Sequence, residues 1–136
     1  MLPLRYASLW RVLSAVLLLF VLAAALAPGW WFDTQAEALD WIEHADKWLH
    51  GLTFLALTLW FAGLVARRAW VQMAIGLLLF GLLIEAAQLL VGYRMGDWID
   101  LAADALGILL GMAIAAAGLG GWGLRLEDWY SRRTAI

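Results

Sequence analysis

The chain has 136 residues, of which 65% are hydrophobic and 15% charged, and its formal net charge is −2. Since soluble domains contain about 45–50% apolar residues, this composition excludes an ordinary soluble fold and indicates a membrane protein. The small net charge and the lack of a Lys- and Arg-rich run exclude a nucleic-acid-binding face, and the absence of cysteine excludes disulfides and thiolate chemistry.

Residues 8–27 form the first apolar run, close to the ~20 residues that cross a ~30 Å hydrocarbon core. Arg5 and Arg11 lie at its start and an alanine-rich stretch closes it, which is also typical of a cleaved signal peptide. Because cleavage would leave three spans and a new terminus made of aromatic residues, we interpret the run as an uncleaved helix. Pro28 and Gly29 are expected to end it.

Residues 29–47 form an acidic connection in which Lys47 is the one cation. Its acidic residues are Asp33, Glu37, Asp40, Glu43 and Asp46. Leu39, Trp41 and Ile42 stand among them at near-helical spacing, which predicts a short helix lying at the membrane interface.

Three more apolar runs follow the acidic connection. They cover residues 48–66, 69–92 and 98–121. The connections between them, residues 67–68 and 93–97, are so short that neighbouring helices are expected to pack as antiparallel hairpins. The predicted fold is therefore all-α, with four transmembrane helices in a single transmembrane domain over residues 1–136.

The basic residues predict the orientation, because Lys and Arg in short loops resist translocation. If the helices alternate, one side receives Arg5, Arg11, Arg67, Arg68, Arg125, Arg132 and Arg133. That side is expected to be cytoplasmic and to hold both termini, whereas Lys47 and Arg94 fall on the opposite, outer side. Tryptophans at both interfaces fit this frame, while Trp60, inside the second span, is expected to fill lipid-facing surface.

Ionisable and amide side chains inside the spans share one depth, near the outer face. They are Asp46, Lys47, His50, Glu85, Gln88, Arg94, Asp97, Asp100 and Asp104. Within each predicted helix these residues are spaced by three or four positions, as in Glu85 and Gln88 or Asp100 and Asp104, and so project from one face of that helix. Burying an ionised group at the bilayer centre costs at least ~2.5 kcal/mol, so these residues are expected to meet in one pocket.

The acidic face of the last span continues into Gly107 and Gly111, a GxxxG spacing that lets a neighbouring helix approach closely. We expect this face to pack within the chain, and a homo-oligomer built on it stays the alternative.

The polar pattern resembles the VanZ-like family. The resemblance rests on Asp46-Lys47-x-x-His50, on Glu85-x-x-Gln88, and on Arg94 followed by Asp100, Asp104 and Gly107, and so covers residues 46–111. It implies a small multi-pass protein of the bacterial cytoplasmic membrane. The member that gives the family its name is associated with low-level teicoplanin resistance. The family more usually shows Asn at the position of Asp104, and the resemblance implies no particular reaction.

Three functions fit this pattern, and a proton-coupled transporter or channel stays a fourth alternative because deep acids could relay protons. In the first, an outward-facing pocket binds a cell-envelope amphiphile, either a lipid phosphate headgroup or a lipoglycopeptide, with Lys47 and Arg94 holding the anion. In the second, an intramembrane enzyme uses His50 or Glu85 as acid or base. In the third, the residues are a structural ion-pair network. No cofactor is predicted, although Glu85, Asp100 and Asp104 leave a divalent metal ion open.

Overall fold

The computed structural model describes residues 1–27, 42–92 and 98–134, and for residues 42–46 it describes the backbone alone. The described residues are mostly helical and contain no strand. The elements are α1 (Ala7–Leu26), α2 (Ile42–Leu64), the short 3-10 helix η3 (Arg67–Ala69), α3 (Trp70–Val91), α4 (Trp98–Ile114), the π-helical turn η4 (Ala115–Leu119) and α5 (Trp122–Thr134).

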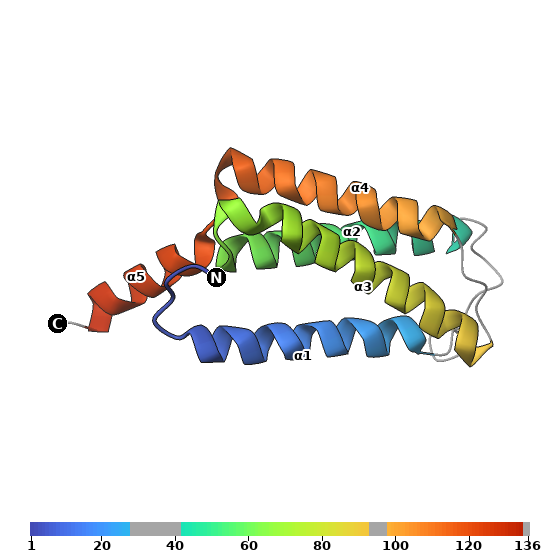
Figure 1. Cartoon of the computed structure of the whole chain (residues 1–136), viewed down its shortest axis with the longest axis horizontal. Helices are drawn as coiled ribbons and strands as arrows, with labels where there is room; N and C mark the ends of the chain where they lie inside the picture. The colour runs from blue at the N-terminus through green and yellow to red at the C-terminus, as the bar shows by residue number, and fades with distance from the viewer. Residues whose placement is uncertain (28–41, 93–97, 135–136) are drawn as a thin grey trace.

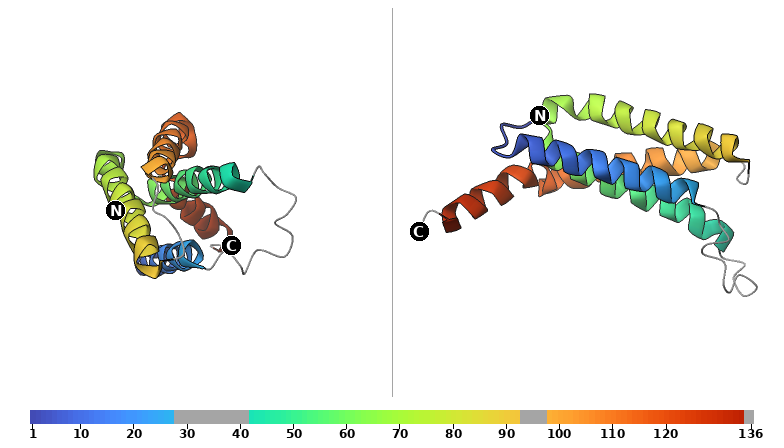
Figure 2. Two further views of the ribbon diagram at one scale, coloured as in Figure 1. Left: turned by 90° about the vertical axis from the view of Figure 1, so that its right-hand side faces the viewer. Right: turned by 90° about the horizontal axis from the view of Figure 1, so that it is seen from below.

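Helices α1 to α4 lie along one another, and α5 projects beyond one end of the bundle (Figures 1 and 2). We call that end, where the N-terminus and α5 lie, the terminal end. At the opposite end, the far end, α1 and α3 finish and α2 and α4 begin (Figure 1). The acidic connection of residues 29–47 was expected to hold a separate interfacial helix. Its residues 42–47 belong to α2, and residues 28–41 lie outside the described residues.

Three helical stretches are long and apolar enough to cross a membrane: Ala7–Leu26, Arg67–Val91 and Trp98–Thr134. The last contains α4, η4 and α5, and α4 supplies its apolar part. Their outward faces carry bare aliphatic and aromatic side chains, such as Phe20, 68% exposed, and Leu90, 88% exposed. Exposing so large an apolar surface to water would be unfavourable, whereas lipid would cover it. The chain is therefore a helical membrane protein.

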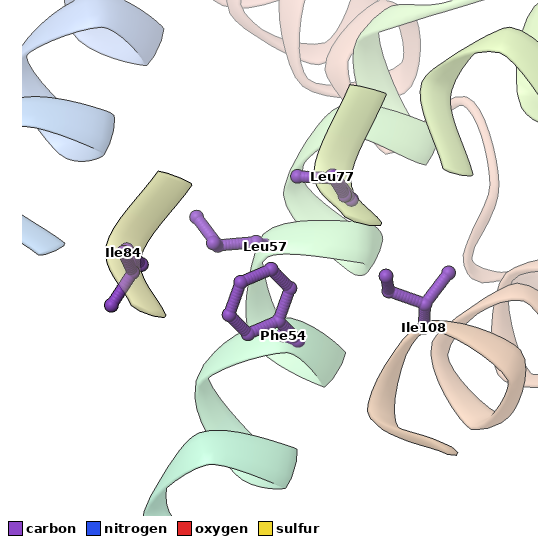
Figure 3. Packing of buried hydrophobic residues seen from close by; sticks show 5 residues of the cluster. All are labelled: Phe54, Leu57, Leu77, Ile84 and Ile108. Atoms are coloured by element: carbon purple, nitrogen blue, oxygen red, sulfur yellow. The ribbon is translucent and has the colours of Figure 1, made fainter. Parts of the chain in front are cut away.

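The core forms where α2, α3 and α4 meet. Its buried members are Phe54, Leu57, Leu77, Ile84 and Ile108 (Figure 3). Helix α1 covers one side of this cluster through partly buried residues, including Leu18 and Leu22. Because α1 contributes only Trp10 and Ser14 as buried residues, it is the most peripheral of the four long helices.

Helices α2 and α4 run in the same direction and approach most closely at their glycines. A side chain added at Gly107 would collide with the backbone carbonyl of Gly51, and one added at Gly111 would lie 2.7 Å from the Cβ of Thr58. Such contact between backbones is what small residues allow in membrane helices, where packing must replace the hydrophobic effect. The glycine face of α4 is thus used inside the chain.

The α4 helix stops earlier than the expected boundary at residue 121. Its regular part ends at Ile114, one π-helical turn follows, and Gly118 then takes a φ of 142° that interrupts the helix. Gly121, at φ 71°, completes the reversal into α5. The amide of Gly121 donates to the carbonyl of Ala62 at 2.9 Å, so the turn is fastened to α2.

A tryptophan cluster, made of Trp10, Trp60 and Trp122, closes the terminal end, with ring centroids 5.4–5.8 Å apart. Each indole N–H has an acceptor: the Glu127 carboxylate for Trp10, the Ser14 hydroxyl for Trp60 and the Leu59 carbonyl for Trp122. Trp60, which was expected to fill lipid-facing surface, is half-buried and packs in this cluster. Its N–H must be satisfied away from water, and Ser14 on α1 provides the acceptor.

Helix α5 is held by Glu127, a residue that the sequence pattern did not single out. Its buried carboxylate accepts hydrogen bonds from the backbone amides of Arg5 and Tyr6, at 2.6 and 3.1 Å, and from the Trp10 indole at 2.7 Å. These two amides precede the first residue of α1, which has no capping side chain of its own. Glu127 therefore caps α1 from α5, and its charge also suits the positive end of the helix dipole.

Acid should release this cap. Burial raises the pKa of Glu127, but the amides of Arg5 and Tyr6, the Trp10 indole and the Arg5 charge outweigh that effect and hold it below its ordinary value of 4.5. The stabilisation is therefore present above pH 4.5 and is lost as the pH falls through the lowered pKa. We expect hydrogen exchange at residues 4–10, corrected for its intrinsic pH dependence, to accelerate below pH 4.5.

The variant Glu127→Gln should show the faster exchange already at neutral pH, and its exchange should no longer depend on carboxylate protonation. Asp128→Asn, at the exposed neighbouring position, is the matched control and should behave as the wild type. Acid-independent protection in the wild-type chain would contradict the capping role.

Candidate functional site

Charged side chains from three helices converge at the far end of the bundle. Lys47 and His50 lie one turn apart near the start of α2, Asp100 and Asp104 lie one turn apart near the start of α4, and Glu85 comes from the second half of α3. We call these five residues the polar cluster. His50 and the three acids are at most 9% exposed, and Asp104 is completely buried.

His50 is the centre of the polar cluster. Its Nδ1 lies 3.1 Å from Asp104 Oδ1, a hydrogen bond that joins α2 to α4. Its Nε2 lies 4.0 Å from Asp100 Oδ2, and the other oxygen of Asp100 lies 3.8 Å from Lys47 Nζ. A ring that donates from Nδ1 to Asp104 would, when neutral, present the lone pair of Nε2 toward Asp100.

Asp104 occupies the deepest position of the polar cluster. Its Oδ2 has no hydrogen-bond partner among the described residues and lies against Gly81 of α3, where an added Cβ would be 2.6 Å away. Gly81 stands one turn from Glu85 on the same helix. The carboxylate thus fills the space that a side chain at position 81 would need, and α3 can pack over it for this reason.

Gln88 serves a different contact. Its amide Nε2 donates to the carbonyl of Ala25 in the last turn of α1, at 2.9 Å. This bond satisfies a carbonyl that has no partner within α1 and ties α1 to α3. Of the other expected site residues, Arg94, Asp97 and the side chain of Asp46 lie outside the described residues.

An apolar groove of about 220 Å³ runs between α2 and α4 beside the polar cluster. Lys47 lines the groove at the far end of the bundle. The other lining residues are Trp48, Gly51, Leu52, Leu55, Ala103, Leu106, Gly107 and Leu110. The walls face outward, since Trp48 is 73% and Leu106 is 58% exposed. A hydrocarbon chain would fit such a surface, and Lys47 is its nearest charged group.

Gly51 is the residue of this region that the sequence reasoning missed. It forms both the contact with Gly107 and the floor of the groove. Its position directly after His50, one turn beyond Lys47, is the signal that could have identified it, because a small residue on that face lets α4 approach the polar side chains.

The fold and this site define a helical membrane protein with a buried cluster of ionisable residues beside an apolar groove. The model of the VanZ/LLP1 family matches residues 5–119. The chain therefore belongs to the VanZ/LLP1 family, which confirms the resemblance found in the sequence. No curated protein and no solved structure matches it.

Proposed function

We propose that the chain is a four-span protein of the bacterial cytoplasmic membrane, with both termini in the cytoplasm. Helix α2 is the fourth span: it is 23 residues long and lies within the bundle beside α4 (Figure 1). Its polar residues, Lys47 and His50 among them, gather at one end and lower its overall apolarity. Within the described residues, every arginine belongs to the terminal end and Lys47 to the far end, as expected if the terminal end is cytoplasmic.

In this orientation we propose that the far end binds a cell-envelope phospholipid from the outer leaflet. The observation that carries this proposal is the apolar groove that ends at Lys47. The acyl chain would lie between α2 and α4, and the phosphate would contact the Lys47 ammonium group at the mouth. Lys47 suits this role because its side chain is still 35% exposed while it lies near Asp100.

The polar cluster would complete the headgroup site. An ionised carboxylate accepts hydrogen bonds, so Asp100 can orient Lys47 and accept from headgroup hydroxyl or amine groups. A lipoglycopeptide also combines an acyl chain with polar groups, and it enters the experiment as a competitor. The His50 to Asp104 bond alone would also suit a purely structural network between α2 and α4, and this alternative predicts no lipid preference.

Native mass spectrometry of the purified chain, equilibrated with phosphatidylglycerol and phosphatidylcholine, tests the binding. Since a cation near an anionic lipid contributes about 1 kcal/mol, Lys47→Ala should lower the preference for phosphatidylglycerol about fivefold. Ala103→Phe should fill the groove and reduce retention of both lipids.

Ala86→Phe, at an exposed position of α3, makes the same change outside the groove and should retain lipid as the wild type does. Competition by an added lipoglycopeptide would identify the second ligand source. Unchanged lipid preference in Lys47→Ala, together with unchanged retention in Ala103→Phe, would overturn the proposal and favour the structural network.

A further inference from the structure

Three buried residues of the polar cluster present metal-ligating atoms to one another. His50, Glu85 and Asp100 each offer one ligand atom, and these atoms all lie within 4.8 Å of one another. They come from α2, α3 and α4, so the three core helices each supply one donor. One imidazole with two carboxylates is a donor set that favours a divalent first-row transition metal over Mg²⁺ or Ca²⁺, which prefer oxygen alone.

The separation of the donors fits an ion. His50 Nε2 and Asp100 Oδ2 are 4.0 Å apart, beyond the ~2.7–3.2 Å of a direct hydrogen bond. Two donors bound to a tetrahedral ion at ~2.1 Å would be about 3.4 Å apart. A side-chain adjustment of about half an ångström would therefore bring both into an ion's coordination shell.

Asp104 orients the ring of His50 in the way that carboxylates orient metal-ligating histidines. Ligating histidines usually donate their other ring N–H to a carboxylate, which fixes the tautomer and aims the remaining lone pair. His50 Nδ1 and Asp104 Oδ1 make this contact at 3.1 Å, and Nε2 is the nitrogen that faces Asp100. Asp104 would thus be a positioning residue.

The burial of charge provides an independent argument. Asp104 is completely buried, and its Oδ2 has no hydrogen-bond partner among the described residues. This oxygen lies against Gly81, which is one turn from Glu85 on α3. Because a buried carboxylate oxygen without a partner is costly inside a membrane, a divalent cation bound next to His50 would compensate the charge of Asp104.

From these contacts we infer that His50, Glu85 and Asp100 hold a divalent transition-metal ion, of the Zn²⁺ or Mn²⁺ class, and that Asp104 orients His50 toward it. The metal site shares Asp100 with the proposed headgroup site, but it does not require a bound lipid, because its ligands are side chains alone.

The test is metal stoichiometry. Tag-free protein is stripped with chelator, dialysed against Zn²⁺, Mn²⁺ or Mg²⁺, and measured by elemental mass spectrometry. We expect one Zn²⁺ or Mn²⁺ per chain, no retained Mg²⁺, and loss of at least tenfold in affinity in Asp100→Asn and Glu85→Gln. His44→Gln removes the only other histidine and Asp128→Asn an exposed acid, and both should bind as the wild type does.

Two readouts on the wild-type chain keep the inference testable if the buried variants do not fold. Bound Zn²⁺ should raise the melting temperature in a concentration-dependent manner, because a ligand that binds only the folded state stabilises it. Co²⁺ bound in its place should show visible absorption from the metal. Metal-free wild-type protein, with no shift in melting temperature and no Co²⁺ absorption, would overturn the inference.

Discussion

Replacing Gly107 with alanine is expected to lower the stability of the folded chain by about 1–3 kcal/mol, the usual cost of overpacking a well-packed interior. The added Cβ would collide with the backbone carbonyl of Gly51 and approach the amide of Leu55 at 3.0 Å. Backbone atoms cannot rotate away as a flexible side chain can. Helices α2 and α4 would have to separate, and the polar cluster would open with them.

Thermal unfolding in detergent, followed by size-exclusion fluorescence, measures this loss. Gly76→Ala is the matched control, since an added Cβ at Gly76 meets nothing within 4 Å and alanine is the better helix former. It should be neutral or stabilising. Equal melting temperatures for the two variants would show that α2 and α4 do not meet at Gly107.

Replacing Asp104 with alanine is expected to destabilise the chain by on the order of 2 kcal/mol, from a lost interhelical hydrogen bond and a buried His50 nitrogen left without its acceptor. Asp104 has no exposed surface, so its carboxylate does not contact bulk solvent in the intact chain. His50 is bonded to it across α2 and α4, so the loss should also weaken the contact between these helices.

The variant Asp104→Asn keeps the shape of the side chain and removes its negative charge. Its carbonyl oxygen can still accept from His50 Nδ1, and its amide places a donor near the position of the buried Oδ2. We therefore expect Asp104→Asn to retain most of the stability lost in Asp104→Ala, as measured by thermal unfolding. Equal losses in both variants would mean that the negative charge itself is required.

Much of the fold follows from elementary features of the sequence. The long apolar runs predict α1, α3 and α4, because about 20 such residues suit only a membrane. The spacing of Asp100 and Asp104, and of Lys47 and His50, predicts that each pair shares a helix face. That these faces meet in the structure follows from the glycines of α4, which let α2 approach closely.

Other features depended on contacts between distant residues, which spacing does not encode. Gln88 has the same periodicity as Glu85, yet its amide reaches the carbonyl of Ala25 because α1 ends beside it. Trp60 sits in an apolar run, but its indole N–H requires an acceptor, and Ser14 is 46 residues away. No local pattern marks either pairing.

Helix α5 is the largest feature that the sequence did not predict. The last predicted span ends at residue 121, and the charged stretch after it, with Arg132 and Arg133, has no apolar run that would predict a further helix. Glu127 becomes informative only once the start of α1 is known to lack a capping side chain.

Side chains from α2 and α4 act as one buried unit, and a double-mutant cycle on His50 and Asp104 tests this coupling most directly. Unfolding free energies are measured for His50→Ala, Asp104→Ala and the double variant. For contacting residues in a membrane protein we expect a coupling energy of about 0.5–1.5 kcal/mol, because the second substitution removes a bond that the first has already broken. Two independent losses that simply add would place these side chains apart and contradict the account.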